Sequence, residues 1–284
     1  MCFLCQAKSQ SGLQPTARRR LFLHLGAAAA AGAAVLPAAA QVDVGSSSWT
    51  RQFVSAEKLE DAAQQEYSKM LSEARAQGAL ASDNNPQLQR LRGIARRIIP
   101  FATQWNPRAT QWRWEVNLIG SKQVNAFCMP GGKIAFYTGI LDQLKLNDDE
   151  VAMIMGHEMA HALREHARER MAKSTGTSLG LSLGAQLLGL GQLGDVAANL
   201  GTQLLTLTYS RSDETEADLV GLELAARAGF NPRASVTLWQ KMSQAGGSGG
   251  IGFLSTHPQG PDRIRKLEDN LPKVQGLYEQ SQKR

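Results

Sequence analysis

The chain has 284 residues, enough for one sizeable hydrophobic core, and its 43% hydrophobic and 20% charged residues argue against a disordered protein or a bundle of membrane helices. Its net charge of +6 depends on the first forty residues, which hold four basic side chains and no acidic one. The remainder carries 27 basic and 25 acidic side chains, so we expect no nucleic-acid partner.

Residues 1–40 have the layout of an export signal. Basic residues come first, an alanine-rich apolar run follows over 21–36, and Ala38-Ala39-Ala40 supplies a small-residue cleavage site. We therefore predict a periplasmic protein whose mature chain begins at Gln41. Arg19-Arg20 suits the twin-arginine route, and the general route is the alternative. A retained membrane anchor is less favoured, because the run is short and rich in alanine.

The positions of the three cysteines agree with the prediction of an exported protein. Cys2 and Cys5 lie in the segment expected to be removed, which leaves Cys128 without a partner for an internal disulfide. The folded domain should then be stabilised by its core alone.

After a linker over 41–54, the chain predicts one α+β domain over 55–284, mainly helical, with a small antiparallel sheet packed on the helices. Capping residues, apolar spacing and turn residues place the elements. The predicted elements are helices at 55–79 and 86–99, strands at 112–119, 124–128 and 133–138, a long helix from Asp148 to about Lys173, helices at 213–228 and 231–245, and a short helix at 262–270.

A Leu/Gly-rich stretch covers 175–207. It could form a cover over a site or make peripheral contact with a membrane. Ordinary helices with small residues at close crossings are the favoured interpretation, because Gln186, Gln192 and Asp195 interrupt the apolar run too often for a bilayer span.

A metal-binding pattern lies within the predicted helix that begins at Asp148. In His157-Glu158-Met159-Ala160-His161 the histidines are one turn apart, so both imidazoles can reach one metal ion. Glu158 stands where a carboxylate can act as general base on water. The pattern is typical of zinc hydrolases, and we predict one Zn²⁺ per chain, although the donor types would also suit another divalent ion.

A third protein ligand is needed, because two histidines hold zinc poorly. A third histidine in the extended H-E-x-x-H-x-x-G-x-x-H pattern is excluded, since positions 164 and 167 are arginine and alanine. His166 should lie on a solvated face, about 140° around the helix from His161. Glu214 and Asp218 are one turn apart in a later helix. We expect Glu214 to bind the metal and Asp218 to hold a ligand histidine, with Glu216 as the alternative ligand.

The motifs together resemble the HtpX-like zinc metallopeptidases of family 48, which include CAAX-prenyl endopeptidases and soluble periplasmic quality-control proteases. The matching motifs are Val124-Asn125-Ala126-Phe127 with Pro130-Gly131-Gly132, His157 to His161, Glu214 to Asp218 after Arg211, and Thr256-His257-Pro258 with Arg263. The resemblance implies a gluzincin-type core in which His157, His161 and Glu214 bind zinc and Glu158 is the catalytic base. Cys128 departs from the family, which usually carries a small apolar residue there. A small buried hydrophobe is its favoured role, and a reactive thiol is the alternative.

We therefore expect a zinc endopeptidase that hydrolyses misfolded or unassembled envelope proteins, of the soluble single-domain branch. The strand with Asn125, Ala126 and Phe127 should bind the backbone of an extended protein or peptide substrate. His257 could mask the metal, stabilise the transition state, or simply hold a turn. The alternative function is a zinc-stabilised chaperone or assembly factor with little proteolysis. The sequence makes no prediction of oligomeric state.

Overall fold

The computed structural model describes residues 42–175, 203–246, 252–258, 260 and 262–283, all within the unit Ala39–Arg284. Its elements, in chain order, are η1 (Trp49–Phe53), α1 (Ala56–Ala76), α2 (Pro86–Ile98), η2 (Ile99–Gln104), η3 (Pro107–Thr110), β1 (Glu115–Ile119), β2 (Ala126–Met129), β3 (Lys133–Tyr137), α3 (Thr138–Leu144), α4 (Asp148–Leu163), α5 (His166–Thr175), α8 (Arg211–Arg227), α9 (Ala234–Gly246), α10 (Gly252–Thr256) and α11 (Arg263–Ser281). No helix within these ranges combines the length and the apolar character that crossing a membrane requires. The predicted export segment, and nearly all of the Leu/Gly-rich stretch, lie outside the described residues.

The helices begin where the sequence supplies capping side chains. At α2, the Asn85 side chain accepts hydrogen bonds from two backbone N–H groups of the first turn, and Pro86 occupies the first helical position. At α4, Asn147 and Glu150 form a reciprocal capping box. The mainly helical α+β fold is confirmed, and most of the predicted helix boundaries are correct to within a few residues.

The sheet has three strands in the order β1-β3-β2. β2 and β3 form an antiparallel hairpin, whose turn requires positive φ at Gly131 (80°) and Gly132 (77°). β1, in contrast, pairs with β3 in parallel. The predicted small sheet is present, but it is mixed rather than antiparallel, because β1 lies beside the second strand of the hairpin instead of the first.

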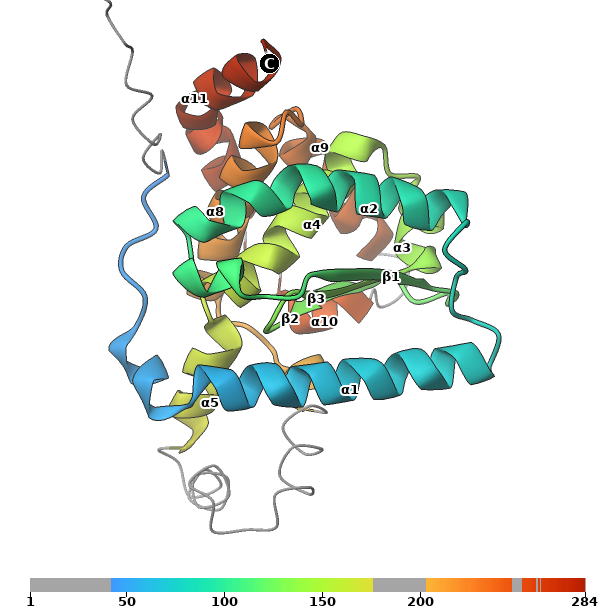
Figure 1. The fold of residues 1–284 in the computed structure, drawn as a ribbon. Coiled ribbons are helices and arrows are strands. Elements are labelled where there is room, and N and C mark those ends of the chain that lie inside the picture. Colours follow the sequence, from blue (N-terminus) through green and yellow to red (C-terminus); the bar gives the residue numbers. More distant parts are fainter. Residues whose placement is uncertain (1–41, 176–202, 247–251, 259, 261, 284) are drawn as a thin grey trace, which may run out of the picture. The chain divides into compact units, whose positions relative to one another are not determined.

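Two hydrophobic cores lie on opposite faces of the sheet, since successive side chains of a strand point to opposite sides. Ile134 and Phe136 of β3 belong to the core shared with α2 and α4, whereas Ala135 belongs to the core between the sheet and α1. Tyr67 of α1 ties that helix to the sheet, because its hydroxyl donates to the Ile134 carbonyl at 2.5 Å. Figure 1 shows α1 below the sheet and α2, α4, α8, α9 and α11 above it.

Some predicted boundaries are wrong. The helix expected to run from Asp148 to about Lys173 ends at Leu163, where Glu165 adopts a left-handed φ of 57° and a separate helix, α5, follows. The C-terminal helix α11 is much longer than the expected 262–270 and continues through Pro272. α3 and α10 were not expected, because both are short and lack a strong capping pattern.

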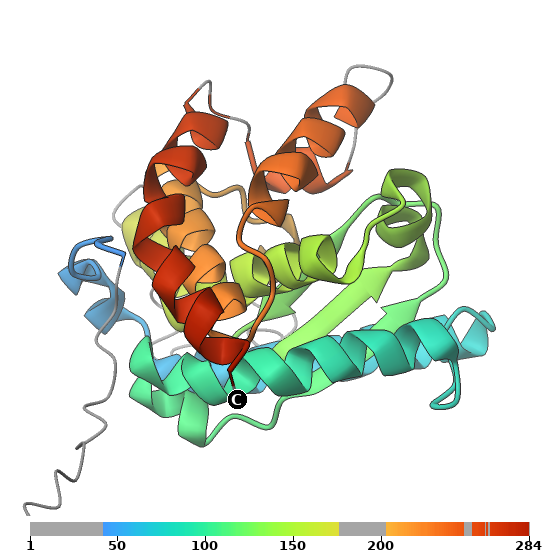
Figure 2. The ribbon, with the colours of Figure 1, turned by 90° about the horizontal axis from the view of Figure 1, so that it is seen from above.

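The backbones of α4 and α8 come into contact where these two helices cross, and Figure 2 shows the two helices from above. Gly156 of α4 faces Gly221 of α8, and a Cβ atom added at Gly221 would lie 2.6 Å from the His157 backbone nitrogen. Only glycine lets two backbones approach this closely. The crossing therefore sets the separation between the His157 region of α4 and the start of α8.

We predict that Gly221→Ala lowers the free energy of unfolding by about 1–3 kcal/mol, because the added methyl group forces the two helices apart. It should also weaken metal binding. Gly276→Ala on α11 is the matched control, since its Cβ would meet no atom within 4 Å, and it should leave stability unchanged or slightly raised. Urea unfolding measures both variants. A Gly221→Ala protein as stable as the wild type would show that this crossing tolerates expansion.

Candidate metal centre

Four buried side chains from three parts of the chain converge at one point. His157 and His161 come from α4, Glu214 from the first turn of α8, and His257 from the residue that follows α10. One potential ligand atom from each lies within 4.8 Å of the others. The structure thus brings together the three predicted ligands, together with His257.

Local structure explains this convergence. The two histidines are four residues apart on α4 and face the same side of it. Glu214 lies in the first turn of α8 because the Ser210–Asp213 capping box starts that helix immediately before it. α10 is held on both sides, since Phe253 N–H donates to the Val124 carbonyl and Tyr209 N–H donates to the Thr256 carbonyl.

The spacing of the donor atoms fits a divalent metal ion. His161 Nε2 lies 3.1 Å from His157 Nε2 and 3.3 Å from Glu214 Oε1, and Glu214 Oε2 lies 3.6 Å from His157 Nε2. Zinc–ligand distances of about 2.0–2.1 Å separate the corners of a tetrahedron by about 3.3–3.4 Å. Atoms that carry lone pairs converge in this way around a cation, and two imidazoles with one carboxylate are a donor set that zinc accepts.

The protonation of these groups also suits a metal. Burial holds the pKa of His161 well below its ordinary value, so its imidazole is neutral, as metal ligation requires. Burial opposes ionisation of Glu214, but hydrogen bonds with His161 and His257 outweigh it and hold the pKa of this carboxyl far below its usual range. The centre therefore offers a neutral nitrogen at His161 and an anionic oxygen at Glu214.

Asp218 lies behind His157, as the sequence predicted. Its Oδ1 is 3.1 Å from His157 Nδ1, so the carboxylate can accept a hydrogen bond from Nδ1–H and fix the tautomer that presents Nε2 to the metal. Arg263 of α11 donates to both Asp218 oxygens, at 2.5 and 2.8 Å, and its Nη1 lies 2.7 Å from Glu214 Oε2. The guanidinium stacks over the Trp239 ring at 3.4 Å. One arginine thus compensates two buried carboxylates.

Glu158 lies next to the centre without belonging to the donor cluster. The residue is 2% exposed, and within the described part of the chain its Oε1 has no hydrogen-bond partner. Burial raises the pKa of this carboxyl above its ordinary value, although His257 and His157 oppose the shift. A carboxylate poised to exchange a proton has these properties.

His257 faces both groups. Its Nδ1 lies 3.0 Å from Glu214 Oε1 and 3.3 Å from His157 Nε2, while its Nε2 lies 3.5 Å from Glu158 Oε1. The imidazole is therefore within reach of the metal position and of Glu158 at the same time.

The structure corrects two expectations on the other side of the centre. His166 was expected on a solvated face, but it is 1% exposed and its Nδ1 lies 2.9 Å from His161 Nδ1. Glu216, the alternative ligand, lies outside the donor cluster and contacts His166 and Arg164 instead. The reason is the end of α4 at Leu163, after which the left-handed Glu165 redirects the chain and turns His166 inward.

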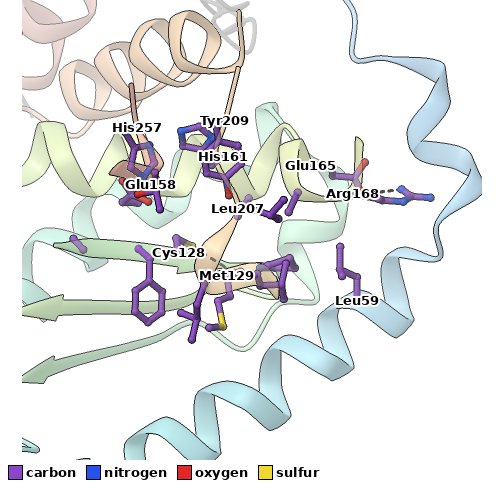
Figure 3. Close-up of a pocket in the computed structure, with 18 of the residues that line it drawn as sticks. Leu59, Cys128, Met129, Glu158, His161, Glu165, Arg168, Leu207, Tyr209 and His257 are labelled. Atoms are coloured by element: carbon purple, nitrogen blue, oxygen red, sulfur yellow. Dashed lines mark hydrogen bonds and ion pairs between the residues drawn. The ribbon is translucent and has the colours of Figure 1, made fainter. Parts of the chain in front are cut away.

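Tyr209 is a residue that the motifs did not indicate. Its ring stacks on His161 with the centroids 3.9 Å apart, and Figure 3 shows it above the cavity beside His257. Desolvation, together with the charges of Glu158 and Glu214, raises its pKa, so the phenol keeps its proton and can donate a hydrogen bond. Its place directly before the Ser210 cap is the only sequence signal that could have drawn attention to it.

A cavity of about 230 Å³ extends from Glu158 and His161. Leu59, Met129 and Leu207 line its apolar part, and Glu165 pairs with Arg168 at 2.9 Å on its far side (Figure 3). The residues of β2, with the preceding Asn125, form another wall, and within the described residues β2 pairs only with β3.

Cys128 also lines this cavity but is buried, and burial raises the pKa of its thiol well above the ordinary value. The thiol therefore stays protonated, which favours the small buried hydrophobe over the reactive nucleophile.

Comparison with known proteins finds one family along most of the chain. The sequence profile of Peptidase family M48 matches residues 86–271. The chain is 39% identical over 172 residues to mitochondrial metalloendopeptidase OMA1 of Schizosaccharomyces pombe, covering 60% of this chain and 50% of that protein. It is 38% identical over 154 residues to OMA1 of Arabidopsis thaliana, covering 54% and 31%. With the metalloprotease LoiP of Escherichia coli it shares 27% identity over 157 residues, covering 53% and 60%. The chain thus spans about half, or less, of the length of the two OMA1 relatives.

These comparisons contradict the periplasmic location predicted from residues 1–40. The OMA1 relatives are named as mitochondrial proteins, although LoiP comes from a bacterium. Composition explains the error, because a basic and acid-free segment is as typical of a mitochondrial transit peptide as of an export signal. The composition of this segment therefore does not identify a compartment.

Proposed function

The chain belongs to peptidase family M48, and we propose that it is a zinc-dependent endopeptidase. The observation that supports this most strongly is the convergence of His157, His161 and Glu214 beside the buried Glu158, whose Oε1 has no hydrogen-bond partner among the described residues. A purely structural zinc site has no need for such a carboxylate. The names of the relatives, metalloendopeptidase and metalloprotease, agree with the proposal.

In the proposed site His157, His161 and Glu214 hold the ion, and Asp218 keeps His157 in the required tautomer. When bound, zinc supplies Lewis-acid chemistry, which makes water a better nucleophile at neutral pH and polarises the scissile carbonyl. The burial of all three ligands strengthens this electrostatic effect, because the surroundings screen charge less than water does.

Glu158 is the proposed general base. Its carboxylate takes a proton from the attacking water and passes that proton to the amine that leaves when the peptide bond breaks. Burial raises its pKa above the ordinary carboxyl value, which makes it a better proton acceptor and then allows it to act as the acid. Tyr209 lies at the same end of the cavity, where its hydroxyl can contact bound substrate.

The proposed substrates are unfolded or unassembled proteins. In an antiparallel pair, residues facing the partner strand alternate with residues facing away. Tyr137 N–H donates to the Asn125 carbonyl, so the backbone of Asn125 and Phe127 faces β3 while that of Ala126 and Cys128 faces the free edge. The Ala126 N–H donates to the Asn125 side-chain oxygen at 3.0 Å, and a substrate strand would replace that contact. The edge can then pair with an extended chain with little sequence preference. Pairing of this kind favours segments that have left their folded structure.

We predict that Glu158→Gln retains its metal and loses cleavage, with a rate about 10²–10⁴-fold lower, because it removes the proton acceptor without removing a ligand. Metal content and casein cleavage by the purified chain measure the two effects. Glu73→Gln, an exposed change on α1, is the matched control and should behave as the wild type. Cleavage by Glu158→Gln at the wild-type rate would refute the role of this residue. Metal in the wild type without any cleavage would instead indicate a masked enzyme or the chaperone or assembly factor, and the His257→Ala variant distinguishes the two.

His257 is proposed to mask the centre. Its Nδ1 lies 3.3 Å from His157 Nε2 and 3.0 Å from Glu214 Oε1, closer than the 3.6 Å between His157 Nε2 and Glu214 Oε2, so it can occupy the position that substrate and water need. The helix that precedes it, α10, is a single short element held by the buried Phe253 side chain and a few backbone hydrogen bonds, and its displacement would open the site.

We predict that His257→Ala raises casein cleavage and slightly weakens metal binding, because it opens the centre and removes one donor. Initial rates and metal titration measure the two effects. Ser255→Ala on α10 is the control, since among the described residues this exposed side chain bonds only to the Gly252 carbonyl. A fall in activity would favour stabilisation of the transition state, and an unchanged rate would exclude both active roles.

A further inference from the structure

The two histidines of the centre are held from behind by different groups. His157 Nδ1 contacts a carboxylate, that of Asp218, at 3.1 Å. His161 Nδ1 contacts another imidazole, that of His166, at 2.9 Å. His161 and His166 are both buried, so bulk water cannot take the place of this hydrogen bond. The proposed metal site therefore has an imidazole where such sites usually have a carboxylate or a carbonyl.

Counting the protons gives each histidine of this pair a definite role. A neutral imidazole that offers Nε2 to a metal carries its proton on Nδ1. His161 Nδ1–H must then donate, and His166 Nδ1 must accept. The proton of His166 is left on Nε2, which points at Glu216 Oε2, 3.4 Å away.

His166 is itself held in place. Arg164 Nε donates to the same Glu216 oxygen at 2.9 Å, and the Arg164 Nη2 group donates to the Gly45 carbonyl at 2.9 Å. The left-handed Glu165 between them makes the turn that brings both side chains to the same carboxylate. A strained conformation of this kind persists where the surrounding contacts require it.

We propose that His166 is a positioning residue for the metal centre. Its Nδ1 accepts a hydrogen bond from Nδ1–H of the ligand His161, while Glu216 and Arg164 fix the orientation of His166. Asp218, held by Arg263, orients His157. His166, held by Glu216 and Arg164, orients His161 in the same way. This inference rests on the proposed metal site. It adds a residue that contacts neither metal nor substrate but determines the orientation and basicity of a ligand.

The test compares Zn²⁺ affinity in the full chain, measured by competition with a chromophoric chelator, and the visible spectrum of the Co²⁺-substituted protein. His166→Leu removes the acceptor and should weaken Zn²⁺ binding by roughly 10–100-fold, with an altered Co²⁺ spectrum. His166→Asn places an amide oxygen near the position of Nδ1 and should restore most of the affinity and the wild-type spectrum. If His166→Leu does not fold, Glu216→Ala replaces it, with a smaller expected loss of affinity.

Met171→Ala is the matched control. Met171 lies on α5, as His166 does, and is buried in the core between the sheet and α1. It should lower stability and leave Zn²⁺ affinity unchanged. The proposal is overturned if His166→Leu binds Zn²⁺ as the wild type does, if His166→Asn is as weak as His166→Leu, or if Met171→Ala weakens binding equally. A wild-type chain that binds no Zn²⁺ would contradict the proposed function instead.

Discussion

The contact between Gly156 and Gly221 is the constraint on which the rest of the centre depends. Two ordinary residues at these positions would separate α4 from α8 by the width of their side chains. His157 follows Gly156 directly, and Asp218 and Glu214 lie one and two turns before Gly221 on the facing helix. The backbones must therefore touch for a carboxylate on one helix to reach imidazoles on the other. The capping boxes of α4 and α8 fix where each helix starts and so complete the alignment.

This close packing buries an unusual amount of charge. Glu158, Glu214 and Asp218 are all nearly inaccessible to water, and Arg263 is the guanidinium that contacts two of them. Buried ion pairs stabilise a fold weakly, because the loss of hydration offsets most of the attraction. A metal ion between the histidines and Glu214 would add the missing positive charge. Metal binding and stability should therefore be coupled in this protein.

Much of the fold and of the centre was predictable because local patterns specify them. Capping residues located the starts of α2 and α4, and spacing of one turn placed two histidines on one face of a helix. The carboxylates at positions 214 and 218 followed from the same spacing. The positions of His166 and Tyr209 were not predictable, since they depend on the left-handed Glu165 and on a tertiary stacking contact. The parallel pairing of β1 likewise depends on long-range topology, which alternation along a strand does not encode.

The measurement that tests this account most directly is X-ray absorption at the zinc edge of the protein purified with its own metal. The account predicts about one zinc per chain, coordinated by imidazole nitrogen and by oxygen at about 2.0–2.1 Å, with no sulfur. Scattering from sulfur at about 2.3 Å, for which Cys128 is the nearby source, would contradict the ligand set. The absence of stoichiometric metal would contradict the metal centre itself.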